Sequence, residues 1–400
     1  MTTIEFETSL SDEEAAVRDT AHRFAEEVLR PVGRALDKMP DPEAVVAPDS
    51  PLWDVFARYR KLGVRDLDDT QSALEPSDRA RVQSLVSEEM GWGDAGLAIS
   101  LGVSQFPRTL ARLSGNPELI ERFGGDEVIG CWPITEPDHG SDQLIYAGRM
   151  HEMPGRPNCV ARRDGGDYVI EGQKSAWVSN GTIATAAALF CAVQDSDGRI
   201  SGPAAFLVPL EEPGVRRGAP LDKIGQRALN QGEIFFDQVR IPASYLVLPP
   251  ELGPWSADSV LANANAGMGA TFVGVARAAL EMAVEYAKER VQGGTAIIGH
   301  QSVRARLFRM YRLTQAARAL SRHTLVHNSA TMPADIALAI ASKVTATETA
   351  FEVASMALQI FGGNGLTRAY PVEKLLRDAR ASMIEDGCNE VLGIMAAGRL

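Results

Sequence analysis

The chain has 400 residues, of which 45% are hydrophobic and 23% are charged, and its formal net charge is −12. Because this length exceeds that of a usual single domain, we expect two or three parts with a large buried core. The acidic balance argues against nonspecific nucleic-acid binding, which needs a basic face, although a few local arginines could still hold a phosphate.

The N-terminal third is expected to be helical. Ser11 and Glu14 match a capping box, in which each side chain accepts a hydrogen bond from the other residue's backbone N–H. Between Val17 and Val32, apolar residues recur every three or four positions, which predicts one buried face of a helix. A second, less polar helical region is expected from Arg79 to Gly102. The first residues, MTTIEFETSLSDEEAAV, lack the apolar core of a signal peptide.

The pattern changes near residue 129. From there to about residue 243, short runs rich in β-branched and aromatic residues are separated by turn residues, which is typical of strands. The clearest runs are DYVIEG, AAALFCAV, AAFLVPL and GEIFFDQVRI. We expect a small antiparallel barrel or sandwich here.

Long helical patterns return after residue 255. They are GATFVGVARAALEMAVEYAKER, SVRARLFRMYRLTQAARALSRH and PADIALAIASKVTATETAFEVASMALQIF, and a short helix is expected after Asn389. Helices of this length predict a bundle. The chain is therefore divided into an N-terminal helical domain (1–128), a middle β-domain (129–243) and a C-terminal four-helix bundle (244–400). No run approaches ~18 uninterrupted apolar residues, so we expect no membrane span.

The cysteine and histidine spacings predict no metal site. The four cysteines lie far apart and form no CxxC, which argues against a disulfide framework or a zinc ribbon and fits a cytoplasmic protein. The six histidines form no HExxH or other ligand spacing.

Three polar stretches have ordinary structural explanations when each is taken alone. FGGNGLTR (361–368) follows a helix rather than a strand, so a helix C-cap explains it better than a dinucleotide fingerprint. Its adjacent glycines would still allow a backbone contact with a phosphate. ITEPDHGSD (134–142) predicts a polar turn, and WVSNG (177–181) predicts a strand that ends in an Asn-Gly turn.

Taken together and in this order, these stretches resemble the acyl-CoA dehydrogenase family of flavoproteins. The resemblance runs from about residue 12 to the end of the chain. Its longest parts are CWPITEPDHGSD, GQKSAWVSNG, DKIGQRALNQGEIFFDQVRIP, YAKERVQGGTAIIGHQ and QIFGGNGLTRAYPVEKLLRDARASMIEDGCNEV. It implies a helical domain, a β-domain and a four-helix bundle, with FAD bound between the β-domain and the bundle and a neighbouring subunit completing the site.

The resemblance also implies the residues that contact FAD and substrate. Near the isoalloxazine, Ile134 and Thr135 would contact the ring, Trp177 would cover one face, and Ser179 would hydrogen-bond near N5, where hydride arrives. The other implied positions are Arg290, Gln292 and Gln301 toward the FAD of the dimer partner, Gln359, Gly362 and Gly363 along that FAD's pyrophosphate and adenosine side, Cys388 and Glu390 as further FAD contacts, and Ser141 and Gly387 as substrate contacts.

The family reaction is an α,β-dehydrogenation, in which a carboxylate removes the α-proton of a thioester while the β-hydrogen leaves as hydride to flavin N5. Such a base needs a desolvated site that raises its pKa. The family motif is commonly Tyr-Glu-Gly-Thr, whereas residues 385–388 here are Glu-Asp-Gly-Cys. We therefore expect Asp386 to be the base, one methylene shorter than usual, with Glu385 at the tyrosine position. Two alternatives stay open: Glu385 acts through a register shift, or the family reaction is absent or altered.

Positions around the base also depart from the family pattern. Members that carry the base on the first bundle helix would have it at Ala264, so no second carboxylate comes from there. Asn265 stands where the family usually has an arginine near the thioester arm, and Ala262 replaces an acidic residue. Asp94 lies where some relatives that act on cyclic acyl-CoA use an additional Asp, although a helix-end Asp is the ordinary explanation.

We expect a FAD-dependent acyl-CoA dehydrogenase that passes electrons to an electron-transfer flavoprotein and assembles as a dimer or a homotetrameric dimer of dimers. An acyl-carrier-protein substrate is one alternative. A catalytically weakened subunit of a heteromeric dehydrogenase is a second. A flavin oxidase or monooxygenase is a third, since nitroalkane oxidases on the same fold pair an Asp base with a serine, although Gly393 stands where those have an arginine.

Overall fold

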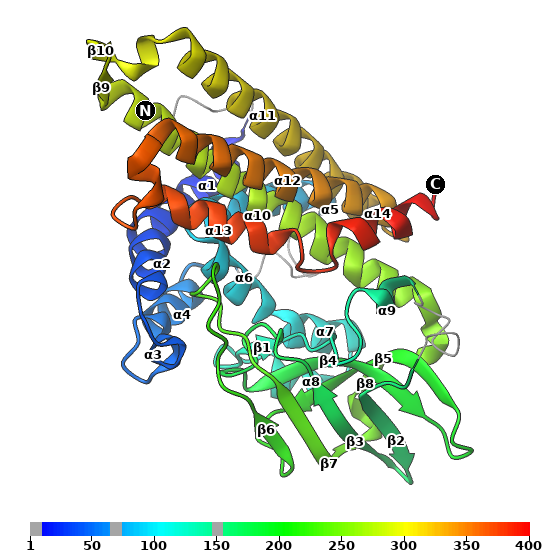
Figure 1. Ribbon diagram of the computed structural model, residues 1–400. Coiled ribbons are helices and arrows are strands. Elements are labelled where there is room, and N and C mark those ends of the chain that lie inside the picture. Colours follow the sequence, from blue (N-terminus) through cyan, green and yellow to red (C-terminus); the bar gives the residue numbers. More distant parts are fainter. Residues whose placement is uncertain (1–9, 65–73, 146–154) are drawn as a thin grey trace.

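A computed structural model describes residues 10–64, 74–145 and 155–400, and its order of helices, sheet and helices confirms the expected fold class (Figure 1). The N-terminal elements are α1 (Asp12–Phe24), the π-helical turn η1 (Ala25–Leu29), α2 (Arg30–Asp37), α3 (Pro42–Val46), α4 (Leu52–Arg60), α5 (Pro76–Gly93), α6 (Ala95–Val103), α7 (Phe106–Ser114) and α8 (Pro117–Phe123). The strand β1 (Gly130–Cys131) follows these helices. The residue numbers at which the three domains begin and end remain predictions.

The predicted start of the first helix is confirmed. Ser11 Oγ accepts from the N–H of Glu14 at 3.1 Å, and the Glu14 carboxylate accepts from the N–H of Ser11 at 2.8 Å. The predicted apolar face continues through α1, η1 and α2, where Ala21, Phe24 and Val28 are buried. The second helical region is divided at Asp94, whose backbone is extended and which ends α5 and begins α6.

The middle of the chain forms one sheet with the strand order β6-β7-β3-β2-β4-β5-β8, and β1 pairs with β4 outside this path. The strands are β2 (Cys159–Asp164), β3 (Asp167–Lys174), β4 (Ala186–Gln194), β5 (Ile200–Pro209), β6 (Val215–Arg217), β7 (Ile234–Pro242) and β8 (Leu246–Leu248), with the short helix α9 (Asp142–Ile145) before them. Helices α7 and α8 cover one face of the sheet, where Leu110, Leu119 and Phe123 join its core.

The sheet differs from the antiparallel one that we expected, because β2 and β1 each pair with β4 in parallel. Parallel neighbours cannot be joined by a hairpin, so the chain leaves the pair and returns through intervening elements, which short-range patterns do not reveal. The hairpin between β2 and β3 was also missed. Asp164 pairs with Asp167 around Gly165-Gly166, a two-residue turn of the kind that favours hairpins.

The C-terminal part is the expected bundle. Its helices are α10 (Gly253–Glu289), α11 (Gln301–Ala330), α12 (Ile336–Phe361), α13 (Val372–Ser382) and α14 (Asn389–Ala397). A small hairpin of β9 (Val291–Gln292) and β10 (Thr295–Ala296) joins α10 to α11 at the end of the molecule farthest from the sheet (Figure 1). In the C-terminal half of α10, Ala276, Ala279 and Ala283 are fully buried and let neighbouring helices approach closely.

One helical stretch, Asp258–Glu289 in α10, is long and apolar enough to cross a membrane by length and composition alone. The most apolar 18-residue window of this stretch is 72% buried inside the protein. A helix surrounded by protein in this way is what the core of a bundle requires.

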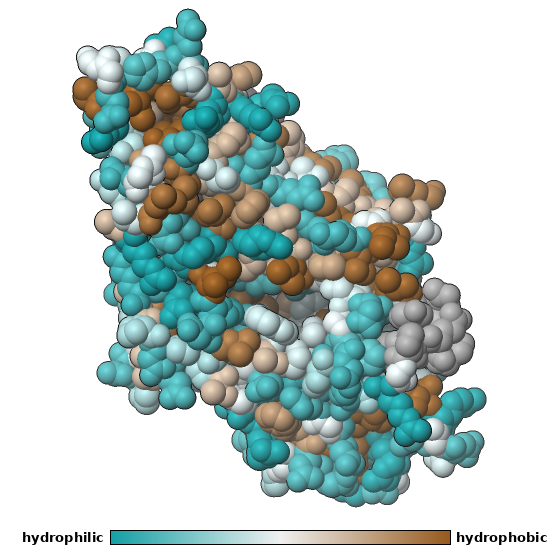
Figure 2. All heavy atoms as spheres, viewed as in Figure 1, coloured by the Kyte–Doolittle hydropathy of each residue, from teal (hydrophilic) through white to brown (hydrophobic). Residues whose placement is uncertain are grey.

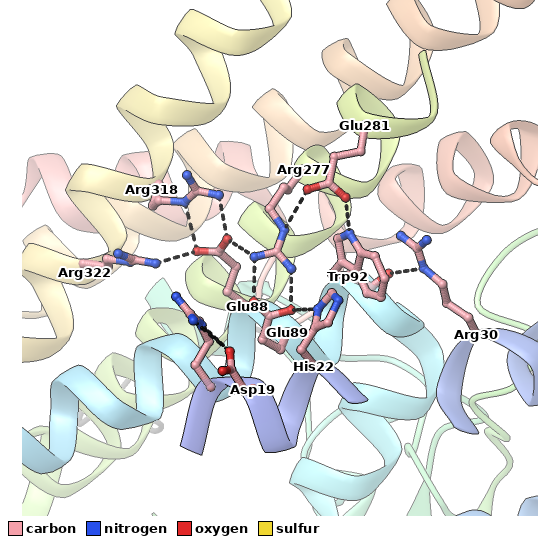
Figure 3. A network of polar contacts seen from close by, with 11 residues as sticks. Asp19, His22, Arg30, Glu88, Glu89, Trp92, Arg277, Glu281, Arg318 and Arg322 are labelled. Atoms are coloured by element: carbon pink, nitrogen blue, oxygen red, sulfur yellow. Dashed lines mark hydrogen bonds and ion pairs between the residues drawn. The ribbon is translucent and has the colours of Figure 1, made fainter. Parts of the chain in front are cut away.

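A network of charged side chains is buried where α5 packs against α10 and α11 (Figure 3). Glu88 accepts from Arg318 at 2.7 Å, from Arg277 at 2.8 Å and from Arg322 at 3.2 Å. Burial alone would raise the pKa of Glu88, but these guanidiniums outweigh burial and lower the pKa to about 2. Glu89 also binds Arg277 and contacts His22 at 2.8 Å. The network therefore joins the N-terminal helices to the bundle through buried opposite charges that neutralise one another.

We predict that Glu88→Gln lowers the free energy of unfolding by about 3–5 kcal/mol at neutral pH, because it leaves buried guanidiniums without their anion. The pKa of Glu88 is depressed in the folded state, so its contribution is present above its ordinary pKa of about 4.3 and is lost as the pH falls toward 2. The gap between wild type and variant should therefore shrink on acidification. Denaturant titrations at several pH values measure this gap.

The matched control is Asp54→Asn, which removes the partner of Arg58 from an exposed i,i+4 pair. This variant should change the free energy of unfolding by less than about 1 kcal/mol. Equal effects of the two substitutions would show that the buried network contributes no more than a surface pair.

Candidate active site

The turn between α13 and α14 carries the predicted base. It has a left-handed backbone, with φ of 50° at Asp386 and 93° at Gly387. Asp tolerates this region better than most residues, and a Cβ on Gly387 would lie 2.8 Å from the side chains of Leu144 and Leu392. Figure 2 shows the surface hollowed between the bundle and the sheet, and in Figure 1 the connection between α13 and α14 lies on the side of the bundle toward the sheet.

A buried lysine of α12 binds the turn between α13 and α14. Lys343 Nζ donates to the carbonyl of Gly387 at 2.9 Å and to Asn389 Oδ1 at 2.8 Å. Burial lowers the pKa of Lys343 to about 8, and the nearby carboxylates of Asp386 and Glu385 act against this decrease. Lys343 therefore fixes the backbone of the turn and places a cation near Asp386.

The turn also meets the polar loop that opens the β-domain. The N–H of Cys388 donates to Ser141 Oγ at 3.0 Å, so the structure brings Ser141 next to the turn that contains Gly387 and Cys388. On the other side, Asn265 Nδ2 of α10 donates to the carbonyl of Asp386 at 3.3 Å. Asp386 thus lies between the bundle and the loop around Ser141.

The two adjacent carboxylates are in different environments. Glu385 Oε2 accepts from Gln226 Nε2 at 2.8 Å. Burial raises the pKa of Glu385 to about 7, against the opposite influence of Lys223 and Gln226. Among the described residues, the Asp386 carboxylate receives no hydrogen bond, and burial raises its pKa despite the charge of Lys343. Asp386 is therefore the carboxylate whose oxygens are left available for a proton.

The residues implied for the flavin ring are held by contacts within the middle part of the chain. The carbonyl of Ile134 accepts from Lys174 at 2.8 Å, and that of Thr135 accepts from the N–H of Ser175 at 2.9 Å. Trp177 is 59% exposed, which is unusual for so large an aromatic side chain. Ser179 Oγ accepts from Gln231 Nε2 at 3.2 Å.

The segment around Trp177 is a turn rather than a strand. Ser179 forms a single bridge with Gln231, and Asn180 has a φ of 61°. The Asn180 side chain is buried and donates to the carbonyls of Ser100 and Gly130. The expected strand is therefore wrong, whereas the expected Asn-Gly turn is present.

Of the remaining implied FAD residues, Glu390 directly follows the turn that carries Asp386, and the others are not brought to this place. Arg290, Gln292 and Gln301 are exposed at the hairpin between α10 and α11, and Gln359 is exposed at the end of α12. Gly362, with a φ of 58°, is the C-cap of α12, and a Cβ on it or on Gly363 would meet nothing within 4 Å. Glu390 is exposed in the first turn of α14. The hairpin lies far from the sheet in Figure 1, so one chain does not gather both groups.

Asp94 has a structural role. Its Oδ1 accepts from the N–H of Leu97 at 2.9 Å and caps α6, while its Oδ2 accepts from Lys374 Nζ at 2.6 Å. Lys374 also binds Asp378 at 2.5 Å. The expected helix-end role of Asp94 is confirmed.

The sequence analysis missed the polar residues that support the turn. These are Lys343, Gln226, Lys223 and Gln231, all of which are buried or partly buried. Lys343 had a visible signal, since it is the one cation in the otherwise apolar first half of α12. The other three lie in a segment whose contacts depend on the fold.

Comparison with known proteins identifies the family of the chain. Residues 131–239 match the family "Acyl-CoA dehydrogenase, middle domain", and residues 255–400 match "Acyl-CoA dehydrogenase, C-terminal domain". The chain is 32% identical over 400 residues to the benzylmalonyl-CoA dehydrogenase of Aromatoleum aromaticum, covering 97% of this chain and 98% of the relative.

Solved structures have the same fold. Butyryl-CoA dehydrogenase from Megasphaera elsdenii has a TM-score of 0.85 at 26% identity, covering 98% of this chain and 99% of that one. A chain from the structural work on the electron transferring flavoprotein of Acidaminococcus fermentans has a TM-score of 0.84 at 26% identity, with the same coverage of 98% and 99%. The chain therefore belongs to the acyl-CoA dehydrogenase family and is a flavin oxidoreductase.

Proposed function

We propose that this protein is a FAD-dependent dehydrogenase of acyl thioesters in which Asp386 removes the α-proton. The observation that carries the proposal is the position of a partly buried carboxylate with free oxygens on a rigid turn beside Ser141. A carboxylate with a raised pKa in a partly desolvated place has the properties of a general base.

The residues present fit a flavin. The exposed indole of Trp177 offers an uncovered aromatic face, and Ser179 offers a hydroxyl on the same turn. Bound FAD would be held there by Ile134, Thr135, Trp177 and Ser179 and, through Cys388 and Glu390, by the turn that carries the base. When bound, FAD supplies the acceptor for the hydride that leaves the substrate's β-carbon.

Each protein group then has a defined task in the reaction. Asp386 takes the α-proton on its carboxylate, and the pKa raised by burial favours holding that proton. Lys343 and Asn265 keep the Asp386 backbone in place through the carbonyls of Gly387 and Asp386. Holding the base to within about 1 Å of its productive position is worth on the order of a hundredfold in rate.

A homo-oligomer is part of the proposal. Arg290, Gln292 and Gln301 are exposed at the end of the molecule opposite the sheet, so they suit the FAD of a neighbouring subunit rather than that of their own chain. An electron-transfer flavoprotein is the proposed electron acceptor, in keeping with the neighbour from the Acidaminococcus fermentans work, and the cytoplasm is the proposed compartment.

We predict that Asp386→Asn retains bound flavin and reduces it with an acyl thioester at least about a hundredfold more slowly, because the amide cannot accept the α-proton. Anaerobic stopped-flow spectroscopy of the oxidised flavin band measures this rate. The companion variant Glu385→Gln keeps an oxygen for Gln226 and should lose much less. A larger loss in Glu385→Gln than in Asp386→Asn would assign the base to Glu385 instead.

We also predict that Lys343→Met shifts the acid limb of the flavin-reduction pH profile to higher pH, because a nearby cation that lowers the pKa of Asp386 is removed. The base must be ionised, so activity falls as the pH drops through its pKa, and a higher pKa moves that fall to higher pH. The control Thr347→Val removes a contact with Asn389 but no charge. It should leave the limb in place, and equal shifts in both variants would exclude an electrostatic effect of Lys343.

A further inference from the structure

Two fully buried amide side chains flank the Glu385–Asp386 pair. Gln226 Nε2 donates to the carbonyl of Asp378 at 3.2 Å and to Glu385 Oε2 at 2.8 Å. Asn265 Nδ2 donates to the carbonyl of Leu261 at 3.1 Å and to that of Asp386 at 3.3 Å. Both side chains are 0% exposed. Each amide thus uses its two N–H groups to hold the chain around the base.

These contacts fix the orientation of both amides. Every partner of Gln226 Nε2 and Asn265 Nδ2 is a carbonyl or carboxylate oxygen, so a flipped amide would place oxygen against oxygen. The amide oxygens, Gln226 Oε1 and Asn265 Oδ1, therefore point away from the partners of the amide nitrogens. Within the described part of the chain, neither oxygen has a hydrogen-bond partner.

Nearby cationic donors are directed to other acceptors. Lys343 binds Gly387 and Asn389, while Lys223 Nζ donates to the carbonyl of Leu229 at 2.8 Å and to Gln231 Oε1 at 2.7 Å. The groups left over around the turn are acceptors: the Asp386 carboxylate and the two amide oxygens. Buried acceptors without a donor are costly, so their natural complement is a ligand that brings N–H or O–H groups.

We propose that the acyl group handled at this site carries a hydrogen-bond donor of its own, an amino or hydroxyl group that reaches Asn265 or Gln226. This inference rests on the proposed dehydrogenase function and specifies its substrate class. A plain alkyl chain brings no donor of its own to either amide oxygen. A site built to bond a substrate OH or NH discriminates strongly against an analogue without it. An enclosed water is the other partner that such oxygens can take, and the experiment separates the two cases.

The experiment compares matched thioesters on the flavin-loaded wild-type protein. A hydroxyl or amino group replaces a methyl group of nearly equal size: 4-hydroxybutyryl- and 4-aminobutyryl-CoA against pentanoyl-CoA, and 2-hydroxybutyryl- and 2-aminobutyryl-CoA against 2-methylbutyryl-CoA. Anaerobic stopped-flow spectroscopy gives the rate of flavin reduction at each concentration. At one or both positions, we expect a donor-bearing substrate to have at least a tenfold higher rate constant divided by half-saturation concentration than its methyl partner.

Two variants assign the preference to the amides. Asn265→Leu and Gln226→Met each remove one orphan oxygen, and the variant that loses the oxygen bound by the substrate's donor should bring the donor-to-methyl ratio toward one. Because the ratio compares two substrates on the same protein, a general loss from a displaced Asp386 cancels. Flavin content and thermal unfolding show whether each variant is folded, and one folded variant is enough for the assignment.

The outcomes distinguish a failure of this inference from a failure of the proposed dehydrogenase function. Methyl substrates that reduce the flavin as fast as their donor partners would overturn the inference, show that water satisfies the two oxygens, and leave the dehydrogenase function standing. A preference that survives in a folded variant would also overturn the role of that amide. Flavin that none of these substrates nor any other acyl thioester reduces would count against the proposed function itself.

Discussion

The ammonium group of Lys343 is the contact on which the candidate site depends most. It reaches the carbonyl of Gly387 and the side chain of Asn389 from inside α12, so the start of α14 and the left-handed turn before it are tied to one bundle helix. Without a buried donor at this point, the Gly387 carbonyl would be an unpaired polar group in the protein interior. The same ammonium also favours the ionised form of Asp386. One side chain therefore links packing of the bundle to the chemistry of the base.

A single segment of the sheet domain connects the two halves of the site. The N–H of Gln226 donates to Asp378 Oδ1 at 2.5 Å, and the carbonyl of Ile224 accepts from Arg377 at 2.6 Å, so this segment is fixed to α13. Gln231, five residues after Gln226, binds Ser179, the residue implied to contact flavin N5. The segment from Gln226 to Gln231 thus contacts α13, the turn that carries Asp386, and Ser179. A shift of α13 would therefore move both parts of the candidate site.

The sequence was sufficient for features that depend on neighbours in the chain. The capping box at Ser11, the C-cap at Gly362 and the long apolar faces of α10 to α12 all follow from local patterns. Local patterns also predict the order of helices, strands and helices, and the family motifs add Asp386 as the expected base. Pairings between distant segments were not accessible in this way. The parallel pairing of β2 with β4 and the hydrogen bond from Gln226 to Glu385, 159 positions apart, exist only because the fold brings those segments together.

The substitution of Asp for the usual glutamate fits the local backbone. Asp386 has a φ of 50°, a region that Asp and Asn occupy more readily than longer side chains because their short polar groups bond locally. The residue before it, Glu385, points instead to Gln226 on the sheet side of the site. The left-handed residue Asp386, between Glu385 and Gly387, thus lets the Glu385 carboxylate bind Gln226 and leaves its own carboxylate without a hydrogen bond among the described residues. The choice of Asp at position 386 and the shape of the turn are therefore a single constraint, and the buried amide side chains of Gln226 and Asn265 bind the two residues of the carboxylate pair.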